Sequence, residues 1–185
     1  MSNKIFIITG PSAVGKTTIA KTIFERFPKL KSAITYTTRQ KRNWSQEDKL
    51  IHYVSQDKFK ELIDEDQFIE WAEVYGEFYG TGKKELLEIL ENHSVLLNID
   101  VQGAQNIKQQ FPESIVFFIQ PDSLEILKIR IDERPIEQSI KDKRWQAAKT
   151  EMAQSQSFDY QITNVDGQLE KALAQISEII RQNSK

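Results

Sequence analysis

Short apolar runs alternate with segments of helical periodicity along most of the chain. The run at residues 5–8 is long enough for one buried strand, and apolar residues recur at helical spacing after it, at Ile19, Ile23, Phe24 and Phe27. Two later runs, at residues 95–100 and 115–119, are almost continuously apolar, which is typical of parallel strands covered on both faces. We therefore predict an α/β fold in which right-handed crossovers connect the strands of a parallel sheet flanked by helices.

The remaining pattern assigns most of the chain to further elements. Pro28 ends the first helix, and Asp122 with Glu125 resembles a capping box that begins a later one. Ser55 and Asp166 are expected to cap helices as well, whereas residues 75–82 are rich in turn signals and aromatic side chains. We predict helices at residues 16–27, 57–64, 83–92, 102–111, 122–134, 137–156 and beyond 166, a loop at 44–49, and strands at 4–9, 31–39, 51–54, 68–74, 95–100, 115–119 and 160–164.

One segment, residues 32–82, interrupts the alternation of strand and helix. Its mixture of short strands and one helix predicts a small α+β lobe inserted over the edge of the sheet. A length of 185 residues suits one compact domain with a sizeable core. We expect a core of residues 1–31, 83–129 and 158–185, the inserted lobe at residues 32–82, and a helical lid with its following helix at residues 130–157.

The composition limits the class of partner. The chain has 25 Lys and Arg against 27 Asp and Glu, and this balance argues against a strongly basic nucleic-acid surface. It has no cysteine, which excludes disulfides and thiolate metal sites and fits a cytoplasmic protein. We expect no signal peptide, because the first predicted strand already begins at residue 4, and no apolar run approaches membrane-spanning length. We expect small-molecule partners rather than nucleic acid or membrane, and both a monomer and a homodimer are compatible with the sequence.

A phosphate-binding motif joins the first strand to the first helix. At such a helix end, unpaired backbone N–H groups and the helix dipole attract an anion, and glycines allow the backbone to approach it closely. The motif lysine adds a full charge against the outer phosphates, and the hydroxyl of Thr17 can hold a magnesium ion. This pattern, G-x-x-x-x-G-K-[ST], predicts a P-loop NTPase-type sheet and comprises Gly10, Pro11, Ser12, Ala13, Val14, Gly15, Lys16 and Thr17.

Two clusters of cations and two carboxylates add candidate chemistry. Arg39 ends the predicted strand at 31–39, and Lys41 and Arg42 follow it. The three cations form either a solvated face or a second anion site. Around Pro135, the cluster of Arg130, Arg134, Lys143 and Arg144 is either a charged helical hairpin or a mobile flap. We favour the flap, because phosphoryl transfer needs cations over the phosphates.

The two carboxylates lie on or after predicted strands. Glu70 sits between Ile69 and Trp71, so alternation places it on the opposite face, in solvent or lining a cleft. Asp100 ends a core strand at the carboxyl edge of the sheet, where open α/β sheets bind ligands.

Over almost its whole length the chain resembles the guanylate kinase family. The resemblance rests on motifs that are weak singly and specific together: residues 10–18, Thr37-Thr38-Arg39 with Arg42, residues 68–72, Tyr79-Gly80-Thr81, residues 99–104, and Arg130, Arg134 and Arg144. It implies transfer of the γ-phosphoryl group of ATP to GMP, giving ADP and GDP, with Mg²⁺ as cofactor.

The resemblance also implies roles for individual residues. Catalytic roles fall to Lys16, Arg39, Arg134 and Arg144, and the metal ligand is Thr17. ATP binding falls to the P-loop residues 10–17 together with Thr18, Arg130 and Asn164. GMP binding falls to Thr35, Arg39, Arg42, Tyr53, Glu70, Tyr79, Thr81 and Asp100. A carboxylate suits guanine because the N1–H and the exocyclic amine are both donors, and adenine lacks both at these positions.

The chain departs from the family pattern at Ala13, where glycine is usual, and at Asn98, where the residue is often acidic. Two alternatives stay open. One is a related P-loop kinase with another phosphorylated acceptor, of the ribose bisphosphate type, although a sugar phosphate offers Glu70 and Asp100 no guanine donors. The other is a catalytically silent guanylate kinase-like interaction domain, although such domains typically lose the lysine that is present here as Lys16.

Overall fold

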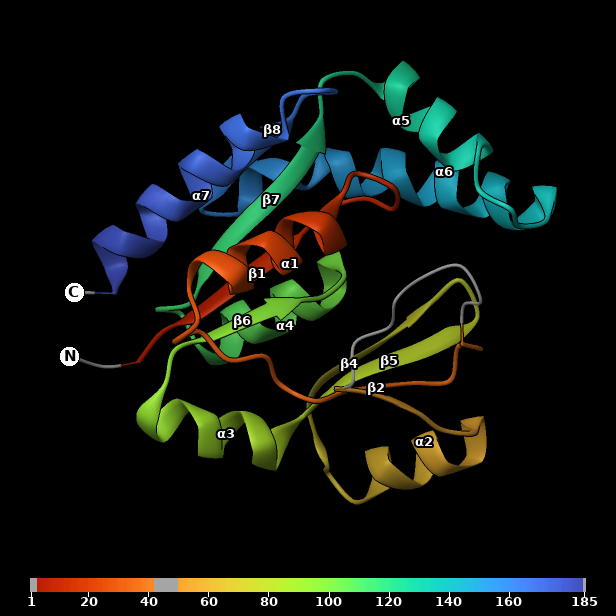
Figure 1. Ribbon diagram of the computed structural model, residues 1–185. Coiled ribbons are helices and arrows are strands. Elements are labelled where there is room, and N and C mark those ends of the chain that lie inside the picture. The colour runs from red at the N-terminus through yellow and green to blue at the C-terminus, as the bar shows by residue number, and fades with distance from the viewer. Residues whose placement is uncertain (1–2, 42–49, 185) are drawn as a thin grey trace.

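The computed structural model describes residues 3–41 and 50–184, whose strands form two sheets (Figure 1). The first sheet is parallel throughout, with strand order β6-β1-β7-β8, and it confirms the predicted α/β class. The second sheet has order β3-β2-β5-β4 and mixes parallel with antiparallel pairs. The strands are β1 (Ile5–Thr9), β2 (Thr35–Thr37), β3 (Ile51–Tyr53), β4 (Phe68–Val74), β5 (Glu77–Gly82), β6 (Val95–Asn98), β7 (Ile115–Pro121) and β8 (Tyr160–Asn164).

The apolar run of β1 is buried along its whole length because β6 and β7 pair with it on its two sides. Successive side chains of a strand point to opposite faces of the sheet. Phe6 and Ile8 therefore join one core cluster, while Ile5 and Ile7 join the other. A strand covered on both faces needs apolar residues at every position, which explains the uninterrupted run.

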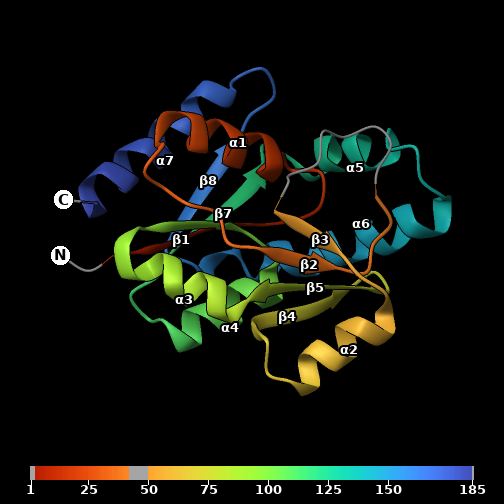
Figure 2. The ribbon, with the colours of Figure 1, turned by 60° about the horizontal axis from the view of Figure 1, so that its bottom comes forward.

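Helices cover both faces of the parallel sheet. In Figure 2, α1 and α7 lie on one face, and α3 and α4 lie on the other. Beyond the carboxyl end of β7, α5 projects away from the sheet, and α6 runs back behind β7 and β8 (Figure 1), where Ala148 packs in the core. Among the described residues, no helix is long and apolar enough to cross a membrane. The helices are α1 (Lys16–Arg26), α2 (Gln56–Asp64), α3 (Lys83–Asn92), α4 (Val101–Gln110), α5 (Leu124–Asp132), α6 (Gln138–Ala153), the short 3₁₀ helix η1 (Ser155–Ser157) and α7 (Leu169–Asn183).

The second sheet is built from residues inside the segment predicted as an inserted lobe. Helix α2 packs its one buried residue, Phe59, against the aromatic rings of Phe68 and Phe78, with centroid distances of 4.5 and 5.3 Å. The predicted cap is confirmed, because the hydroxyl of Ser55 accepts a hydrogen bond from the backbone N–H of Lys58 at 3.2 Å.

Four local expectations are wrong. The strand predicted at residues 31–39 is confined to the three residues of β2, Thr35–Thr37. The other three expectations failed because of a neighbouring residue or a distant contact. Residues 77–82 form the strand β5 rather than a connection, since the turn is only Tyr75-Gly76, with φ angles of 58° and 84°. Helix α5 is capped by Ser123 instead of Asp122, because the Ser123 hydroxyl accepts from the N–H of Ile126. Asp166 does not cap α7, which begins after Gln168; its carboxylate pairs with Arg130.

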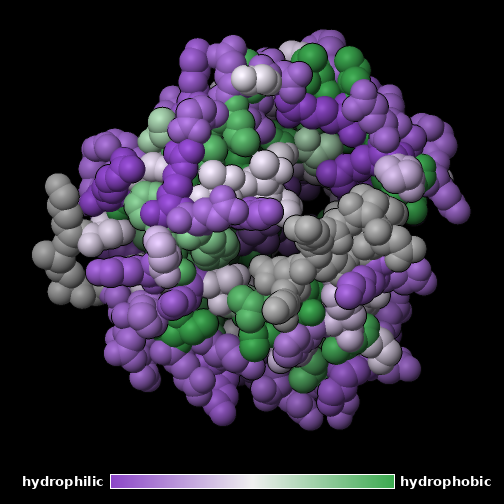
Figure 3. All heavy atoms as spheres, in the orientation of Figure 1, coloured by the Kyte–Doolittle hydropathy of each residue, from purple (hydrophilic) through white to green (hydrophobic). Residues whose placement is uncertain are grey.

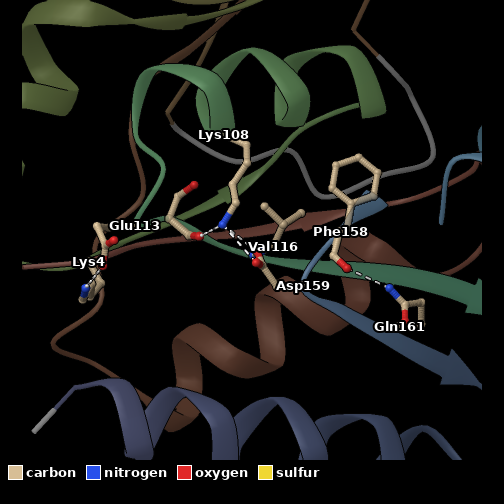
Figure 4. A network of polar contacts seen from close by, with 8 residues as sticks. Lys4, Lys108, Glu113, Val116, Phe158, Asp159 and Gln161 are labelled. Atoms are coloured by element: carbon tan, nitrogen blue, oxygen red, sulfur yellow. Dashed lines mark hydrogen bonds and ion pairs between the residues drawn. The ribbon is translucent and has the colours of Figure 1, made fainter. Parts of the chain in front are cut away.

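A polar network secures the amino ends of the parallel strands (Figure 4). The carboxylate of Asp159, just before β8, accepts from the backbone N–H of Val116 at 2.9 Å and from Lys108 Nζ at 3.0 Å. Lys108, on α4, also donates to the Ser114 carbonyl at 2.6 Å. These contacts join α4, β7 and β8 at the amino end of the sheet. The P-loop directly follows β1 and therefore lies at the opposite, carboxyl end, where open α/β sheets bind ligands.

Candidate functional site

The loop between β1 and α1 has the backbone geometry of an anion-binding nest. Three of its residues have left-handed φ angles: Gly10 at 131°, Ala13 at 70° and Gly15 at 98°. A Cβ at Gly10 would lie 2.2 Å from the Ile119 carbonyl oxygen, so only glycine fits this crossing over β7. Alternating backbone conformations of this kind turn successive N–H groups toward one point, as phosphate binding requires. Thr17 and Thr18 are exposed at the first turn of α1.

Ala13 is the one P-loop residue that adopts a left-handed φ although it is not glycine. We expect Ala13→Gly to raise the free energy of unfolding by about 0.5 kcal/mol. The left-handed conformation costs a non-glycine residue about 1–2 kcal/mol, more than the roughly 0.5–1 kcal/mol of extra chain entropy that glycine loses on folding. Urea denaturation measures the change.

A matched control is Ala174→Gly at an exposed position of α7, which should be destabilising by about 1 kcal/mol because glycine is a poor helix former. Destabilisation of similar size at both positions would contradict the account of Ala13.

A buried amide from β8 supports the P-loop. Asn164 donates from Nδ2 to the Val14 carbonyl at 2.9 Å, and a Cβ at Gly15 would lie 2.6 Å from the same Nδ2 atom. Glycine at this position therefore allows the loop to approach the amide. A hollow of about 240 Å³ opens beside this contact, and its lining includes Ala13, Gly15, Thr18, Arg130, Asn164 and Asp166. Arg130 borders it while paired to Asp166 at 2.9 Å.

Lys16 lies inside the curve of its own loop. Its Nζ donates to the carbonyl oxygens of Gly10 and Pro11 at 2.6 and 2.8 Å. Burial lowers the pKa of Lys16 to about 8; the negative charges of Glu151 and Asp100 oppose this shift, and the positive charges of Arg134 and Arg144 add to it. The positive charge of Lys16 is therefore weakly stabilised in the unliganded protein, in a site where the charges of Arg134 and Arg144 also act.

The structure brings the predicted cationic flap to the P-loop. Arg144, on α6, donates from Nη1 to the hydroxyl oxygen of Ser12 at 2.7 Å. Arg134 follows α5, and its charge acts on Lys16 and on Tyr75. Lys143, the neighbour of Arg144, is exposed. The arrangement argues against a charged hairpin that lies wholly in solvent, because Arg144 binds Ser12 of the P-loop and the charge of Arg134 acts on Lys16.

Glu70 is a buried carboxylate on β4, with only 5% of its surface exposed. Its Oε1 accepts a hydrogen bond from the Thr81 hydroxyl at 2.5 Å. A Cβ at Gly103 would lie 2.5 Å from Glu70 Oε2, so glycine there lets α4 approach the carboxylate. Burial raises the pKa of Glu70 to about 7; the hydrogen bond from Thr81 opposes the shift, and the charge of Asp100 adds to it.

Simple alternation does not describe β4 at this point. Ile69 and Glu70 are both buried, whereas Trp71 is 41% exposed. The pairing of β4 with β5 shifts register between Phe68 and Glu70, and such an irregularity turns a side chain to a new direction. Of the two positions left open for Glu70, solvent or cleft, the structure excludes solvent, because the side chain is buried.

Asp100 lies near both Lys16 of the P-loop and the buried carboxylate Glu70. It caps α4, because its Oδ1 accepts from the backbone N–H groups of Gln102 and Gly103 at 2.8 and 3.0 Å. Its charge raises the pKa of Lys16 and also that of Glu70, so it lies within electrostatic reach of both. Asn98, two residues earlier, is exposed at the end of β6.

The second sheet places the other predicted acceptor residues on neighbouring strands. Thr35 of β2 is opposite Thr81 of β5, and Thr37, two pairs further along, is opposite Tyr79. Arg39 follows β2, and its Nη2 donates to the Tyr53 hydroxyl oxygen at 3.3 Å. Figure 3 shows a hollow in this face of the molecule, with hydrophilic and near-neutral side chains along the part of its rim that is coloured. The predicted phosphate ligand Arg42 and the predicted loop at 44–49 lie outside the described residues.

Two residues at this site are absent from the sequence-based predictions. Tyr75, in the β4–β5 turn, places its ring centroid 4.7 Å from the guanidinium carbon of Arg144. Glu151, on α6, has a buried Oε2 atom without a hydrogen bond among the described residues, and burial raises its pKa against the opposing charge of Lys16. The sequence offers one signal for Tyr75, namely a bulky residue directly before Gly76 in a tight turn. It offers none for Glu151, which is one of many charged residues in a helix.

Comparison with known proteins agrees with this geometry. The family model described as guanylate kinase matches residues 2–183. The guanylate kinase of Dechloromonas aromatica is 38% identical over 183 residues, covering 98% of this chain and 90% of the relative. That of Caldanaerobacter subterraneus is 39% identical over 178 residues, covering 95% and 85%.

Solved structures are similar as well. The crystal structure of guanylate kinase from Anaplasma phagocytophilum has a TM-score of 0.79 at 28% identity, covering 98% of this chain and 86% of that one. Shikimate kinase from Bacteroides thetaiotaomicron has a TM-score of 0.52 at 15% identity over 96% of this chain and 98% of that one, a likeness of fold alone. The P-loop with its lysine, the buried carboxylate of Glu70 and the match along almost the whole length together show that this chain belongs to the guanylate kinase family.

Proposed function

We propose that this protein transfers the γ-phosphoryl group of ATP to GMP, giving ADP and GDP. The observation that carries the proposal is the position of Asp100 between two different binding chemistries. A Cβ at Gly103 would lie 2.5 Å from Glu70 Oε2 and 3.5 Å from Asp100 Oδ2, so the two carboxylates approach the same point of α4. The charge of Asp100 acts on Glu70, the buried carboxylate suited to guanine, and on Lys16, in the loop suited to phosphates. A donor site and an acceptor site therefore share one cleft, as direct transfer between two bound nucleotides requires.

On the donor side, the nest of backbone N–H groups at residues 10–17 holds the ATP phosphates. Lys16 exchanges its two neutral carbonyl partners for charged phosphate oxygens, which are stronger acceptors. Arg134 and Arg144 neutralise the moving phosphoryl group. Arg130, Asn164 and Thr18 border the hollow beside the loop, where the nucleoside part of ATP has room.

On the acceptor side, Arg39, Tyr53 and Tyr79 hold the phosphate of GMP, and Arg42 joins them on the strength of the family resemblance. Arginine suits this task because its planar guanidinium binds phosphate oxygens in pairs. The guanine edge is read by Glu70, Asp100, Thr35 and Thr81. A carboxylate buried as deeply as Glu70 strongly disfavours a base that brings no donors, and this disfavours AMP.

The reaction needs no strong base. The attacking atom is a phosphate oxygen of GMP that is already anionic, so no proton has to be removed before it attacks the γ-phosphorus of ATP. The bond from that phosphorus to the β,γ-bridging oxygen breaks as the new bond forms, and ADP leaves. Positioning and charge neutralisation therefore account for the catalysis, which explains why the site is lined by cations and amides.

The residues at the P-loop fit a magnesium ion that arrives with ATP. Among the described residues, no group of three or more His, Asp and Glu side chains forms a cage for a cation. Mg²⁺ bound to a nucleotide usually takes one or two protein oxygens and completes its shell with phosphate oxygens and water. The exposed hydroxyl of Thr17, at the first turn of α1, suits that role. Such an ion supplies positive charge to the triphosphate.

The alternatives gain no support from the comparisons, whose curated relatives are named guanylate kinase. The intact Lys16 argues against a catalytically silent domain. We propose the same division of the single domain as above, with residues 32–82 as the GMP-binding lobe and residues 130–157 as the lid and its helix. We place the protein in the cytoplasm, with its nucleotide substrates.

A coupled assay of ADP release tests this function. The protein is incubated with ATP, Mg²⁺ and one acceptor at a time: GMP, AMP, UMP, CMP or a ribose bisphosphate. Of these acceptors, we expect only GMP to give rapid ADP release. We expect this release to stop when a chelator removes the metal. Faster release with a ribose bisphosphate would support the related kinase instead, and no release with any acceptor would support a silent domain.

A further inference from the structure

We propose that Tyr75 is a positioning residue, which holds Arg144 against the P-loop and so couples the acceptor-binding sheet to the site of phosphoryl transfer. The inference rests on the role proposed for Arg144 in the transfer. It concerns a contact between three segments that are distant in the sequence: the β4–β5 turn, α6 and the P-loop.

The guanidinium of Arg144 is held on two sides. One edge donates to the Ser12 hydroxyl oxygen at 2.7 Å, and the Tyr75 ring centroid lies 4.7 Å from its central carbon. The Nε atom of Arg144 is buried and has no hydrogen bond among the described residues, so the ring and Ser12 supply the main polar contacts. A cation over an aromatic face is more strongly attracted when both groups are shielded from water.

The backbone at Tyr75 shows that the side chain serves a tertiary purpose. Val74 pairs with Glu77, so the turn between β4 and β5 has only the two residues Tyr75 and Gly76. Both have positive φ angles, at 58° and 84°, where glycine, asparagine and aspartate are strongly preferred. A tyrosine is costly in this conformation. Residues that break a local rule are expected where a distant contact compensates for the cost.

The surroundings of the phenol favour a neutral ring. Burial raises the pKa of Tyr75, and the neighbouring charge of Glu151 raises it further, against the charge of Arg144. The ring therefore faces the guanidinium as a π system over the physiological pH range and forms no ion pair with it.

The same two strands carry the guanine-reading residues. Glu70 lies on β4 and Thr81 on β5, and Tyr75 lies in the turn that joins these strands. A GMP molecule that binds Glu70 and Thr81 and holds β4 and β5 in place therefore also holds the Tyr75 ring in place against Arg144. The arginine is then in place over the donor phosphates when the acceptor is bound.

Substitutions at Tyr75 test the inference in the full-length protein, with ADP release as the readout. Tyr75→Phe keeps the ring and should keep a kcat close to that of the unmodified protein. Tyr75→Leu and Tyr75→Asn remove the ring and should lower kcat about tenfold, with a smaller change in the KM for GMP. Asparagine accepts the left-handed backbone, so a loss of kcat in Tyr75→Asn without a loss of thermal stability identifies the ring and not the fold.

A double-mutant cycle with Arg144→Lys asks whether Tyr75 acts through Arg144. Lysine keeps the charge and loses the planar face, so Tyr75→Leu should cost little further kcat in that background. Full additivity of the two losses would overturn the inference, and so would an unchanged kcat in Tyr75→Leu and Tyr75→Asn. Either result leaves the proposed function standing, whereas an unmodified protein without GMP-dependent ADP release would refute that function itself.

Discussion

Replacing Lys16 with alanine is expected to lower kcat roughly 100- to 1,000-fold while leaving the fold intact. Loss of one well-placed donor to developing charge costs about this much in other enzymes. Lys16 donates its hydrogen bonds to two carbonyl oxygens of its own loop, and burial disfavours its charge, so alanine removes little that stabilises the folded state. Steady-state ADP release measures kcat, and thermal denaturation measures the fold.

Lys21→Ala is the matched control, because Lys21 is an exposed lysine on the same helix. Lys21→Ala should change neither kcat nor the thermal denaturation temperature. A second readout uses pH: with a pKa of about 8, Lys16 loses its charge above that pH in the unliganded protein. The kcat/KM for ATP should therefore fall above about pH 8, and this fall should be absent from the alanine variant. Near-normal turnover in Lys16→Ala would remove the lysine from the mechanism.

Replacing Glu70 with glutamine is expected to lower kcat/KM for GMP roughly 100-fold, with little change in the KM for ATP. The amide of glutamine turns a donor toward the N1–H or the exocyclic amine of guanine, so a charge-assisted hydrogen bond is lost and a buried donor is left unpaired. Glu73→Gln is the matched control, since Glu73 is an exposed carboxylate on the same strand. Equal losses for GMP and ATP would contradict the assignment of Glu70 to guanine.

The same substitution has a pH-dependent effect on stability. The pKa of Glu70 is raised by burial from 4.5 to about 7 in the folded protein, so the folded state binds more protons than the unfolded state between these values. Stability therefore falls as pH rises through this window, and the loss is complete above pH 7. Glutamine carries no charge, so Glu70→Gln should be more stable than the unmodified protein by about 2–3 kcal/mol at pH 8 and about equal to it at pH 4.5.

Urea denaturation at the two pH values measures this difference. The kcat/KM for GMP in the unmodified protein should correspondingly rise with pH through about 7, as Glu70 becomes the acceptor that guanine needs. A stability difference that is the same at pH 4.5 and pH 8 would show that Glu70 is already ionised across this range.

The features that the sequence determined by itself are those carried by adjacent residues. The P-loop is one stretch of chain between a strand and a helix, so Gly10, Gly15 and Lys16 suffice to predict its anion-binding backbone. The runs in β1, β6 and β7 identify buried parallel strands, because a strand covered on both faces has no polar positions. The helix α3 and the strands β4 and β8 begin and end at the predicted residues for the same local reasons.

Only the tertiary structure decided what depends on residues far apart in the chain. Burial raises the pKa of Glu70, and that buried position depends on an irregular pairing with β5 and on the close approach of Gly103, on a helix of another segment. Asp166, which the sequence predicts as a helix cap, forms an ion pair with Arg130 instead. The ring of Tyr75, in the β4–β5 turn, contacts the guanidinium of Arg144, on α6. Local propensity is a property of neighbouring residues, whereas burial, desolvation and ion pairing are set by whichever segments the fold brings together.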